Sequence, residues 1–169
     1  MNGIPANPAG WLASEKLDGV RCTFTGHAFT SRHGNIFTPP ASWLAGMPAC
    51  RLDGELYAGI QSFDELVSAI QRKRNPWENV RFMIFDLAVM RQPIESRHAT
   101  LASLSLPPHC QLVPHRPLAG MDDLDAMETE IVAAGGEGVC IREPGSYYAP
   151  SNFRKVKRLF PDLDRSIFD

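Results

Sequence analysis

A tight turn near the start of the chain, flanked by two strand-like segments, limits how this sequence can fold. The turn is Lys16-Leu17-Asp18-Gly19-Val20-Arg21, and Asp-Gly is a typical turn dipeptide. Residues 11–13 and 20–30 on either side have the composition of short strands, with Gly26 placed as in a hairpin. The pattern predicts short, hairpin-linked strands with a lysine and an arginine held at a turn between them.

Lys16 is the candidate nucleophile of this turn. A lysine amine has an ordinary pKa of about 10.4, so it is protonated at neutral pH and attacks poorly. Lowering that pKa into the neutral range costs about 4 kcal/mol, which neighbouring cations and partial burial can supply. The cations that the sequence offers for this purpose are Arg21, Arg32, Lys155 and Lys157. We therefore expect the pKa of Lys16 to be lowered.

Composition indicates one globular domain with a proper core. The chain has 169 residues, of which 44% are hydrophobic and 21% charged. Its net charge of −2 argues against general adhesion to nucleic acids, so phosphate contacts must come from local clusters such as Arg72-Lys73-Arg74 and residues 154–158. No apolar run is long enough to span a bilayer, and the N-terminus has no secretory pattern. We expect no membrane contact and a cytoplasmic setting.

The four cysteines predict no metal site. They are widely spread without a Cys-x-x-Cys pair, which favours reduced thiols, and we interpret the grouping of His109, Cys110 and His115 in a proline-rich loop as chance.

Strand-like and helix-like segments alternate irregularly along the rest of the chain. Strands are predicted at residues 51–57, 82–87, 111–113, 137–142 and 153–158. Helices are predicted at residues 63–73, at 94–104, and after a cap at Asp122 or Asp123. This arrangement favours an α+β fold with antiparallel sheets over a doubly wound fold.

Two acids on predicted strands and two lysines near the end complete a pattern that suits nucleotidyl transfer. In that chemistry an amine attacks the α-phosphate of a nucleotide while cations neutralise the phosphates. Mg²⁺ prefers one or two carboxylates together with phosphate oxygens and water, which Glu55 and Glu137 can provide.

From Trp11 to Arg158 the sequence resembles the ATP-dependent DNA ligases, most closely those of the short bacterial and phage type. They belong to the covalent nucleotidyltransferases, which include RNA ligases and mRNA capping enzymes. The stretches that carry the resemblance are Lys16–Arg21, Ser31-Arg32-His33-Gly34, Asp53-Gly54-Glu55, Phe85-Asp86, Glu137-Gly138 and Lys155-Val156-Lys157.

The resemblance implies two packed, mainly antiparallel sheets flanked by helices, in the ligase adenylation fold. It also implies an enzyme that uses ATP with Mg²⁺ or Mn²⁺ and acts on nicked duplex DNA in repair, replication or recombination. By this resemblance Lys16 would form the lysyl-AMP bond, and Arg21 and Arg32 would contact the nucleotide and the 5′-phosphate of the nick. Glu55 would bind the ribose and a metal ion, and Glu137 would bind the metal ion. Phe85 would stack on adenine, and Lys155 and Lys157 would contact the α-phosphate.

Relatives of this family continue into an oligonucleotide-binding barrel, whereas eleven residues follow Arg158 here. We therefore expect a monomer with one nucleotidyltransferase domain over residues 1–169 and no barrel. Three possibilities stay open at this point: a natural minimal ligase, a chain that needs a partner to clamp DNA, or a truncated or degenerate relative. The likeness to phage ligases extends the expected cytoplasmic setting to that of a phage-infected bacterial host.

Two other functions also stay open. One is a non-catalytic nucleotide- or DNA-binding relative, and the other is an enzyme of the RNA ligase or guanylyltransferase type. The individual residues have plainer interpretations too: Phe85 as a core side chain, and Lys155 and Lys157 as guards of an exposed edge strand.

Overall fold

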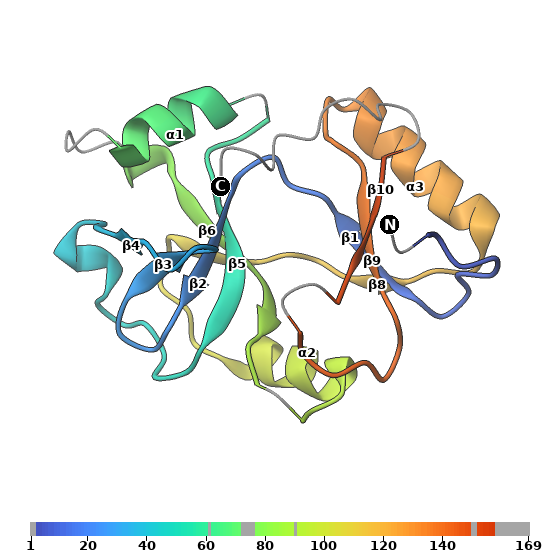
Figure 1. Cartoon of the computed structure of the whole chain (residues 1–169), viewed down its shortest axis with the longest axis horizontal. Helices are drawn as coiled ribbons and strands as arrows, with labels where there is room; N and C mark the ends of the chain where they lie inside the picture. The colour runs from blue at the N-terminus through green and yellow to red at the C-terminus, as the bar shows by residue number, and fades with distance from the viewer. Residues whose placement is uncertain (1–2, 61, 72–76, 90, 150–151, 158–169) are drawn as a thin grey trace.

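Two β-sheets stand side by side in the computed structural model, which describes residues 3–60, 62–71, 77–89, 91–149 and 152–157 (Figure 1). The four-stranded sheet has the order β10 (Arg154–Val156), β9 (Val139–Arg142), β1 (Leu12–Glu15), β8 (Arg116–Pro117). The six-stranded sheet has the order β4 (Ile36–Phe37), β3 (Phe29–Ser31), β2 (Val20–Phe24), β5 (Leu52–Tyr57), β6 (Arg81–Leu87), β7 (Cys110–Leu112). Neighbouring strands are antiparallel except for β6 and β7, which confirms the mainly antiparallel α+β prediction.

Three α-helices in the described part of the chain cover these sheets. They are α1 (Phe63–Gln71), α2 (Ile94–Ser103) and α3 (Met121–Ala133). In Figure 1, α1 lies against the six-stranded sheet, α3 against the four-stranded sheet, and α2 below the space between them. None of them is long and apolar enough to cross a bilayer.

The helix predictions are confirmed for α1 and α2 within the described residues. The basic cluster at 72–74 and Arg158 lie outside these residues. The predicted cap of α3 is wrong, because its N-cap is Gly120. Asp123 lies in the first turn and accepts the Ala119 N–H at 2.9 Å and two N–H groups of Arg116.

The turn at Lys16–Arg21 carries the chain from one sheet to the other. β1 belongs to the four-stranded sheet and β2 to the six-stranded sheet, so the strands on either side of the turn do not pair. β2 pairs instead with β3 and β5, and Gly26 lies in the predicted hairpin with a φ of 101°. The lysine turn therefore lies where the two sheets meet.

Each sheet has its own apolar core, and a small third cluster lies between them. The larger core includes Phe24, Leu52 and Phe82, while the core beneath α3 includes Leu124 and Ile141. The third cluster consists of the buried residues Met83, Phe85 and Val113 with the partly buried Leu17 and Tyr57. It brings the residue after the lysine into contact with the six-stranded sheet.

A β-bulge between β5 and β6 redirects the side chains of the β6 strand. Asp53 pairs with Asp86 and Gly54 with Ile84, so Phe85 is the extra residue. A Cβ on Gly54 would lie 2.4 Å from the Met83 carbonyl oxygen, and only glycine tolerates that approach. Strand alternation places Phe85 with Met83 outside the larger core, and the bulge keeps Asp86 out of it as well, while Leu87 returns to it.

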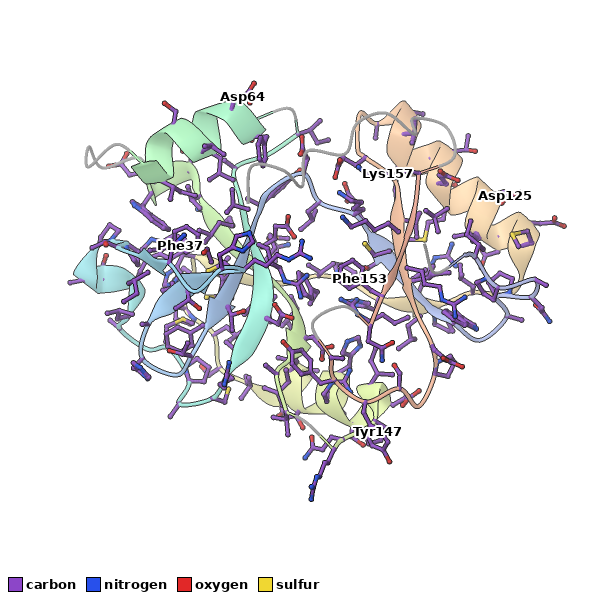
Figure 2. All side chains as sticks on the ribbon, in the orientation of Figure 1. Phe37, Asp64, Asp125, Tyr147, Phe153 and Lys157 are labelled. Atoms are coloured by element: carbon purple, nitrogen blue, oxygen red, sulfur yellow. The ribbon has the colours of Figure 1, made fainter. Side chains whose placement is uncertain are left out.

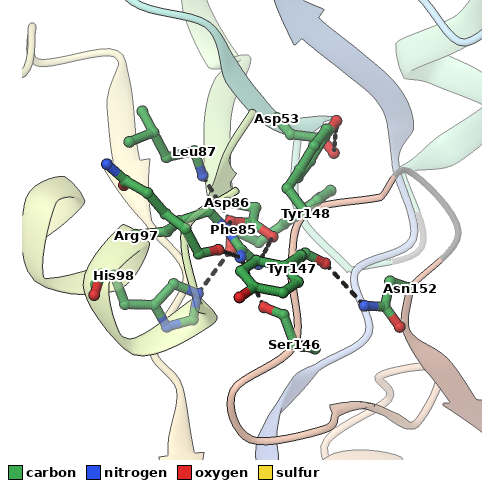
Figure 3. A network of polar contacts seen from close by, with 12 residues as sticks. Asp53, Phe85, Asp86, Leu87, Arg97, His98, Ser146, Tyr147, Tyr148 and Asn152 are labelled. Carbon is green, nitrogen blue, oxygen red and sulfur yellow. Dashed lines mark hydrogen bonds and ion pairs between the residues drawn. The ribbon is translucent and has the colours of Figure 1, made fainter. Parts of the chain in front are cut away.

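Arg97 joins α2 to the six-stranded sheet through a buried ion pair. Its Nε and Nη2 donate to the two carboxylate oxygens of Asp86 at 2.7 and 3.0 Å. The side chains are 2% and 6% exposed, so water could not solvate either charge if its partner were removed. Arg97 also donates to the carbonyl oxygens of Gln92 and Ser146. It therefore fastens the segment after β9 to α2 (Figure 3).

We expect Arg97→Met to lower the free energy of unfolding by about 3–5 kcal/mol, because Asp86 would keep an uncompensated buried charge. Arg116→Met is the matched control, since its pair with Asp123 is 46% and 27% exposed, and a much smaller loss of stability is expected there. Urea unfolding followed by circular dichroism measures both. Equal losses in the two variants would contradict the structural role of the buried pair.

Candidate active site

Three strand ends of the four-stranded sheet bring two lysines to one carboxylate. Lys16 directly follows β1, Glu137 precedes β9 and Lys157 directly follows β10. Glu137 accepts a hydrogen bond from Lys16 Nζ through Oε2 and one from Lys157 Nζ through Oε1 at 2.7 Å. The three side chains are 10–14% exposed. The chain therefore holds its candidate nucleophile in a shielded, charged cluster.

The backbone around Glu137 fixes this cluster. The Lys16 N–H donates to the Gly138 carbonyl oxygen at 2.8 Å. Gly138 has a φ of 139°, and a Cβ there would lie 2.3 Å from the Val156 carbonyl oxygen. A side chain at this position would push the last residue of β10 away, and Lys157 with it.

The prediction that the pKa of Lys16 is lowered is wrong. Burial alone lowers it, but the hydrogen bond and charge of Glu137, with a contribution from Glu55, raise the pKa above its ordinary value of 10.5. The amine is an ammonium group in this conformation. The same finding shows that the Glu55 carboxylate on β5 lies close enough to act on Lys16 across the space between the sheets.

The six-stranded sheet holds Arg21 in a two-pronged ion pair that the sequence did not reveal. Arg21 on β2 donates from Nε and Nη2 to the two oxygens of Asp53 on β5, at 2.8 and 2.6 Å. Asp53 is 1% exposed and also accepts the O–H of Tyr148 at 3.0 Å. Bidentate geometry fixes a guanidinium more firmly than a single contact does.

Two guanidinium groups lie over the Phe85 ring. The Cζ atoms of Arg21 and Arg142 are 4.5 and 5.1 Å from its centroid, and the same atoms lie 5.5 and 5.6 Å from the centroid of Phe153. Phe153 lies between the two sheets in Figure 2. Such contacts stabilise a cation at an apolar wall. Phe85 therefore faces this intersheet space and not the larger core.

Arg142 is buried on β9, and no carboxylate in the described residues forms an ion pair with it. It is 5% exposed, and its Nη1 lies 2.9 Å from Nε2 of His115. His115 Nδ1 lies 2.8 Å from the Val113 carbonyl oxygen, so Nδ1 carries the proton and Nε2 accepts from Arg142. Burial, followed by the charges of Arg142 and His98, lowers the pKa of His115 to about 3. The grouping of His109, Cys110 and His115 forms no metal cluster in the described residues.

Two predicted site residues do not join the cluster in this conformation. Arg32 is exposed in the turn between β3 and β4, and Lys155 is exposed on β10. Neither forms a hydrogen bond or an ion pair with the residues that the structure describes. Lys155 does share its register position with Cys140 on β9, so it lies on the side of the sheet that faces Lys16.

Glu55 and Glu137 are the residues able to hold a divalent metal ion here. Their carboxylates come from different sheets and both act on the charge of Lys16. Two carboxylates with phosphate oxygens suit Mg²⁺, so the donor set fits, although both oxygens of Glu137 now hold lysines. No group of three metal-binding side chains occurs in the described residues.

Comparison with known proteins identifies the family. The model of the ATP dependent DNA ligase domain matches residues 5–159. The chain belongs to this ligase domain family.

Two relatives show how far the match extends. A DNA ligase of Haemophilus influenzae is 27% identical over 154 residues, which make up 89% of this chain and 58% of that protein. A Lig E DNA ligase, described as binding DNA with a minimal scaffold, is 31% identical with a TM-score of 0.83 over 90% of this chain and 63% of its own. This ligase domain thus spans less than two thirds of either relative.

A more distant structure supports the fold alone. The Chlorella virus DNA ligase-adenylate is 18% identical, with a TM-score of 0.72 over 88% of this chain and 61% of its own. The prediction of a ligase adenylation fold is confirmed by these matches.

We expect His115→Gln to make this ligase domain less sensitive to acid. The folded-state pKa of His115, about 3, lies below the ordinary 6.5, so its contribution to stability is complete above pH 6.5 and declines as the pH falls toward 3. Between pH 7 and pH 5 this residue should cost the wild type about 2 kcal/mol of unfolding free energy. Glutamine keeps an acceptor for Arg142 but takes up no proton.

Urea unfolding at the two pH values tests this expectation, with His33→Gln, at an exposed position, as the control. The His33 variant should follow the wild type, whereas the His115 variant should lose about 2 kcal/mol less. Equal pH dependence in all three proteins would show that His115 is not held neutral.

Proposed function

We propose that this chain is the catalytic core of an ATP-dependent DNA ligase that forms a covalent lysyl-AMP at Lys16. The observation that carries the proposal is the cluster in which Lys16 and Lys157 both donate to Glu137, together with Arg21 over the Phe85 ring in the other sheet. Membership of the ligase domain family supports ATP as the nucleotide. The DNA ligase relatives support nicked duplex DNA as the substrate.

In the first step Lys16 Nζ bonds to the α-phosphorus of ATP, the bond to the bridging oxygen breaks, and pyrophosphate leaves with the electron pair. The ammonium group must first lose a proton, and Glu137 Oε2 is the acceptor already in place. We assign to Lys157, which donates to the other oxygen of Glu137, the task of balancing the charge of the α-phosphate.

In the later steps an oxygen of the 5′-phosphate at a nick attacks the AMP phosphorus, which breaks the P–N bond and frees Lys16. The 3′-hydroxyl then attacks the activated phosphate, and AMP leaves. Arg21, fixed by Asp53, and Arg32, exposed on its turn, are the cations we assign to the nucleotide and the 5′-phosphate.

The remaining assignments concern the nucleotide. Phe85 provides the apolar wall for adenine, and Glu55 holds the ribose. Mg²⁺ or Mn²⁺, held by Glu55 and Glu137, would neutralise phosphate charge when bound. Lys155 completes the set only if its exposed side chain turns toward the phosphate.

One observation favours a non-catalytic nucleotide-binding chain as the alternative. The raised pKa of Lys16 keeps the amine charged, and a charged amine binds phosphate without attacking it. The two functions differ in whether the protein becomes labelled.

We expect wild-type protein incubated with Mg²⁺ and [α-³²P]ATP to become covalently labelled on the peptide that contains Lys16, one of four lysines in the chain. Lys16→Arg keeps a cation beside Glu137 but has no usable nucleophile, so it should fold normally and take up no label. ATP binding without label in the wild type would favour the non-catalytic alternative.

The labelled protein then allows the substrate to be tested. Nicked duplex DNA should discharge the label and be joined, whereas nicks with RNA ends and labelling from [α-³²P]GTP should be at least about tenfold less effective. Preference for RNA ends or GTP would instead place the chain with the RNA ligase or guanylyltransferase type of enzyme.

A further inference from the structure

A tyrosine from the connection between β9 and β10 reaches the ion pair of Arg21 in the other sheet. The O–H of Tyr148 donates to Oδ2 of Asp53 at 3.0 Å, a contact that Figure 3 marks with a dashed line. The neighbouring Tyr147 is 62% exposed and lies at the outer edge of the molecule in Figure 2. Two adjacent tyrosines thus have opposite surroundings.

Asp53 receives three hydrogen bonds from two residues. Oδ1 accepts from Arg21 Nε at 2.8 Å, and Oδ2 accepts from Arg21 Nη2 at 2.6 Å and from Tyr148. A carboxylate that is 1% exposed cannot replace a lost donor with bulk water. The Tyr148 hydroxyl is therefore the donor other than Arg21 that holds the orientation of the carboxylate. Burial and the charge of Asp53 raise the pKa of Tyr148, so the hydroxyl keeps its proton.

Rigid contacts with α2 hold the segment that carries Tyr148. Arg97 donates to the Ser146 carbonyl oxygen at 2.9 Å, and Glu95 accepts the Gly145 N–H at 2.8 Å. The Cζ atom of Arg97 also lies 5.9 Å from the centroid of the Tyr148 ring. The position of the hydroxyl is thus set by a helix and by the buried Arg97–Asp86 pair.

We propose that Tyr148 is a positioning residue for Arg21: acting through Asp53, it fixes the guanidinium over Phe85, where the nucleotide and the 5′-phosphate are expected. The inference rests on the proposed function, because that function gives Arg21 its task. Tyr148 touches no reacting atom. Its effect is to keep Arg21 from turning away from its place in the intersheet space when phosphate binds.

Tyr148→Phe removes a single oxygen and leaves the ring in place. We expect the rate of lysyl-AMP formation or of AMP transfer to nicked DNA to fall about tenfold, the effect of one lost hydrogen bond to a charged group. Tyr147→Phe, the matched control on the neighbouring exposed residue, should react like the wild type. If both variants keep the wild-type rates, the proposal fails.

A double-mutant cycle separates positioning from simple stabilisation of the fold. In an Arg21→Lys background, which lacks the two-pronged contact with Asp53, adding Tyr148→Phe should change the rate by less than about twofold. The same tenfold loss in both backgrounds would show that Tyr148 acts independently of Arg21 and would overturn the inference.

A nucleotide-free measurement distinguishes failure of this inference from failure of the proposed function. In protein labelled with ¹⁵N-arginine, the Nε–H resonance of Arg21 should move and exchange faster with solvent in Tyr148→Phe, but not in Tyr147→Phe. If the wild type forms no lysyl-AMP while this resonance responds, the proposed function alone is wrong. An unchanged resonance in Tyr148→Phe would overturn the positioning role whatever the activity.

Discussion

The carboxylate of Glu137, shared by Lys16 and Lys157, is the interaction on which the site depends. It joins the ends of three neighbouring strands, β1, β9 and β10, and it is nearly buried. The carboxylate needs both cations, because a buried charge without partners is costly. Glycine at position 138 allows β9 and β10 to approach closely enough for one carboxylate to meet both lysines.

The second half of the site comes from the other sheet and depends on different constraints. The lysine turn crosses from the four-stranded to the six-stranded sheet. Arg21, five residues after Lys16, therefore already lies on β2 of the other sheet. Phe85 points to the same space as Met83, two residues earlier on β6, and Asp53 holds Arg21 beside that ring. Side chains from both sheets thus line a common space without belonging to either main core.

The sequence predicted the local elements well. Strands around Glu55 and Phe85 and the helices α1 and α2 follow from apolar periodicity, which depends only on neighbours in the chain. It did not predict the bond between Tyr148 and Asp53, which spans 95 positions, or the partnership of Arg142 with His115. Contacts between two sheets leave no periodic signal in the sequence.

The direction of the Lys16 pKa shift could not be predicted either. The sequence showed several cations but not that a carboxylate would lie closer to Lys16 than any of them. The predicted N-cap of α3 was wrong for a related reason. Asp123 accepts hydrogen bonds from Arg116 and Ala119, and the local sequence pattern does not show these partners.

Glu137 is the main group that raises the pKa of Lys16 and keeps its amine charged until nucleotide arrives. An NMR titration of the side-chain Cε and Nζ resonances of Lys16 in nucleotide-free protein tests it most directly, alongside Glu137→Gln. The pKa of Lys16 should lie above 10.5 in the wild type and fall below that value in the variant, where only the weaker effects of Cys140 and Glu55 oppose burial. A wild-type pKa at or below 10.5, or one that the substitution leaves unchanged, would contradict this account.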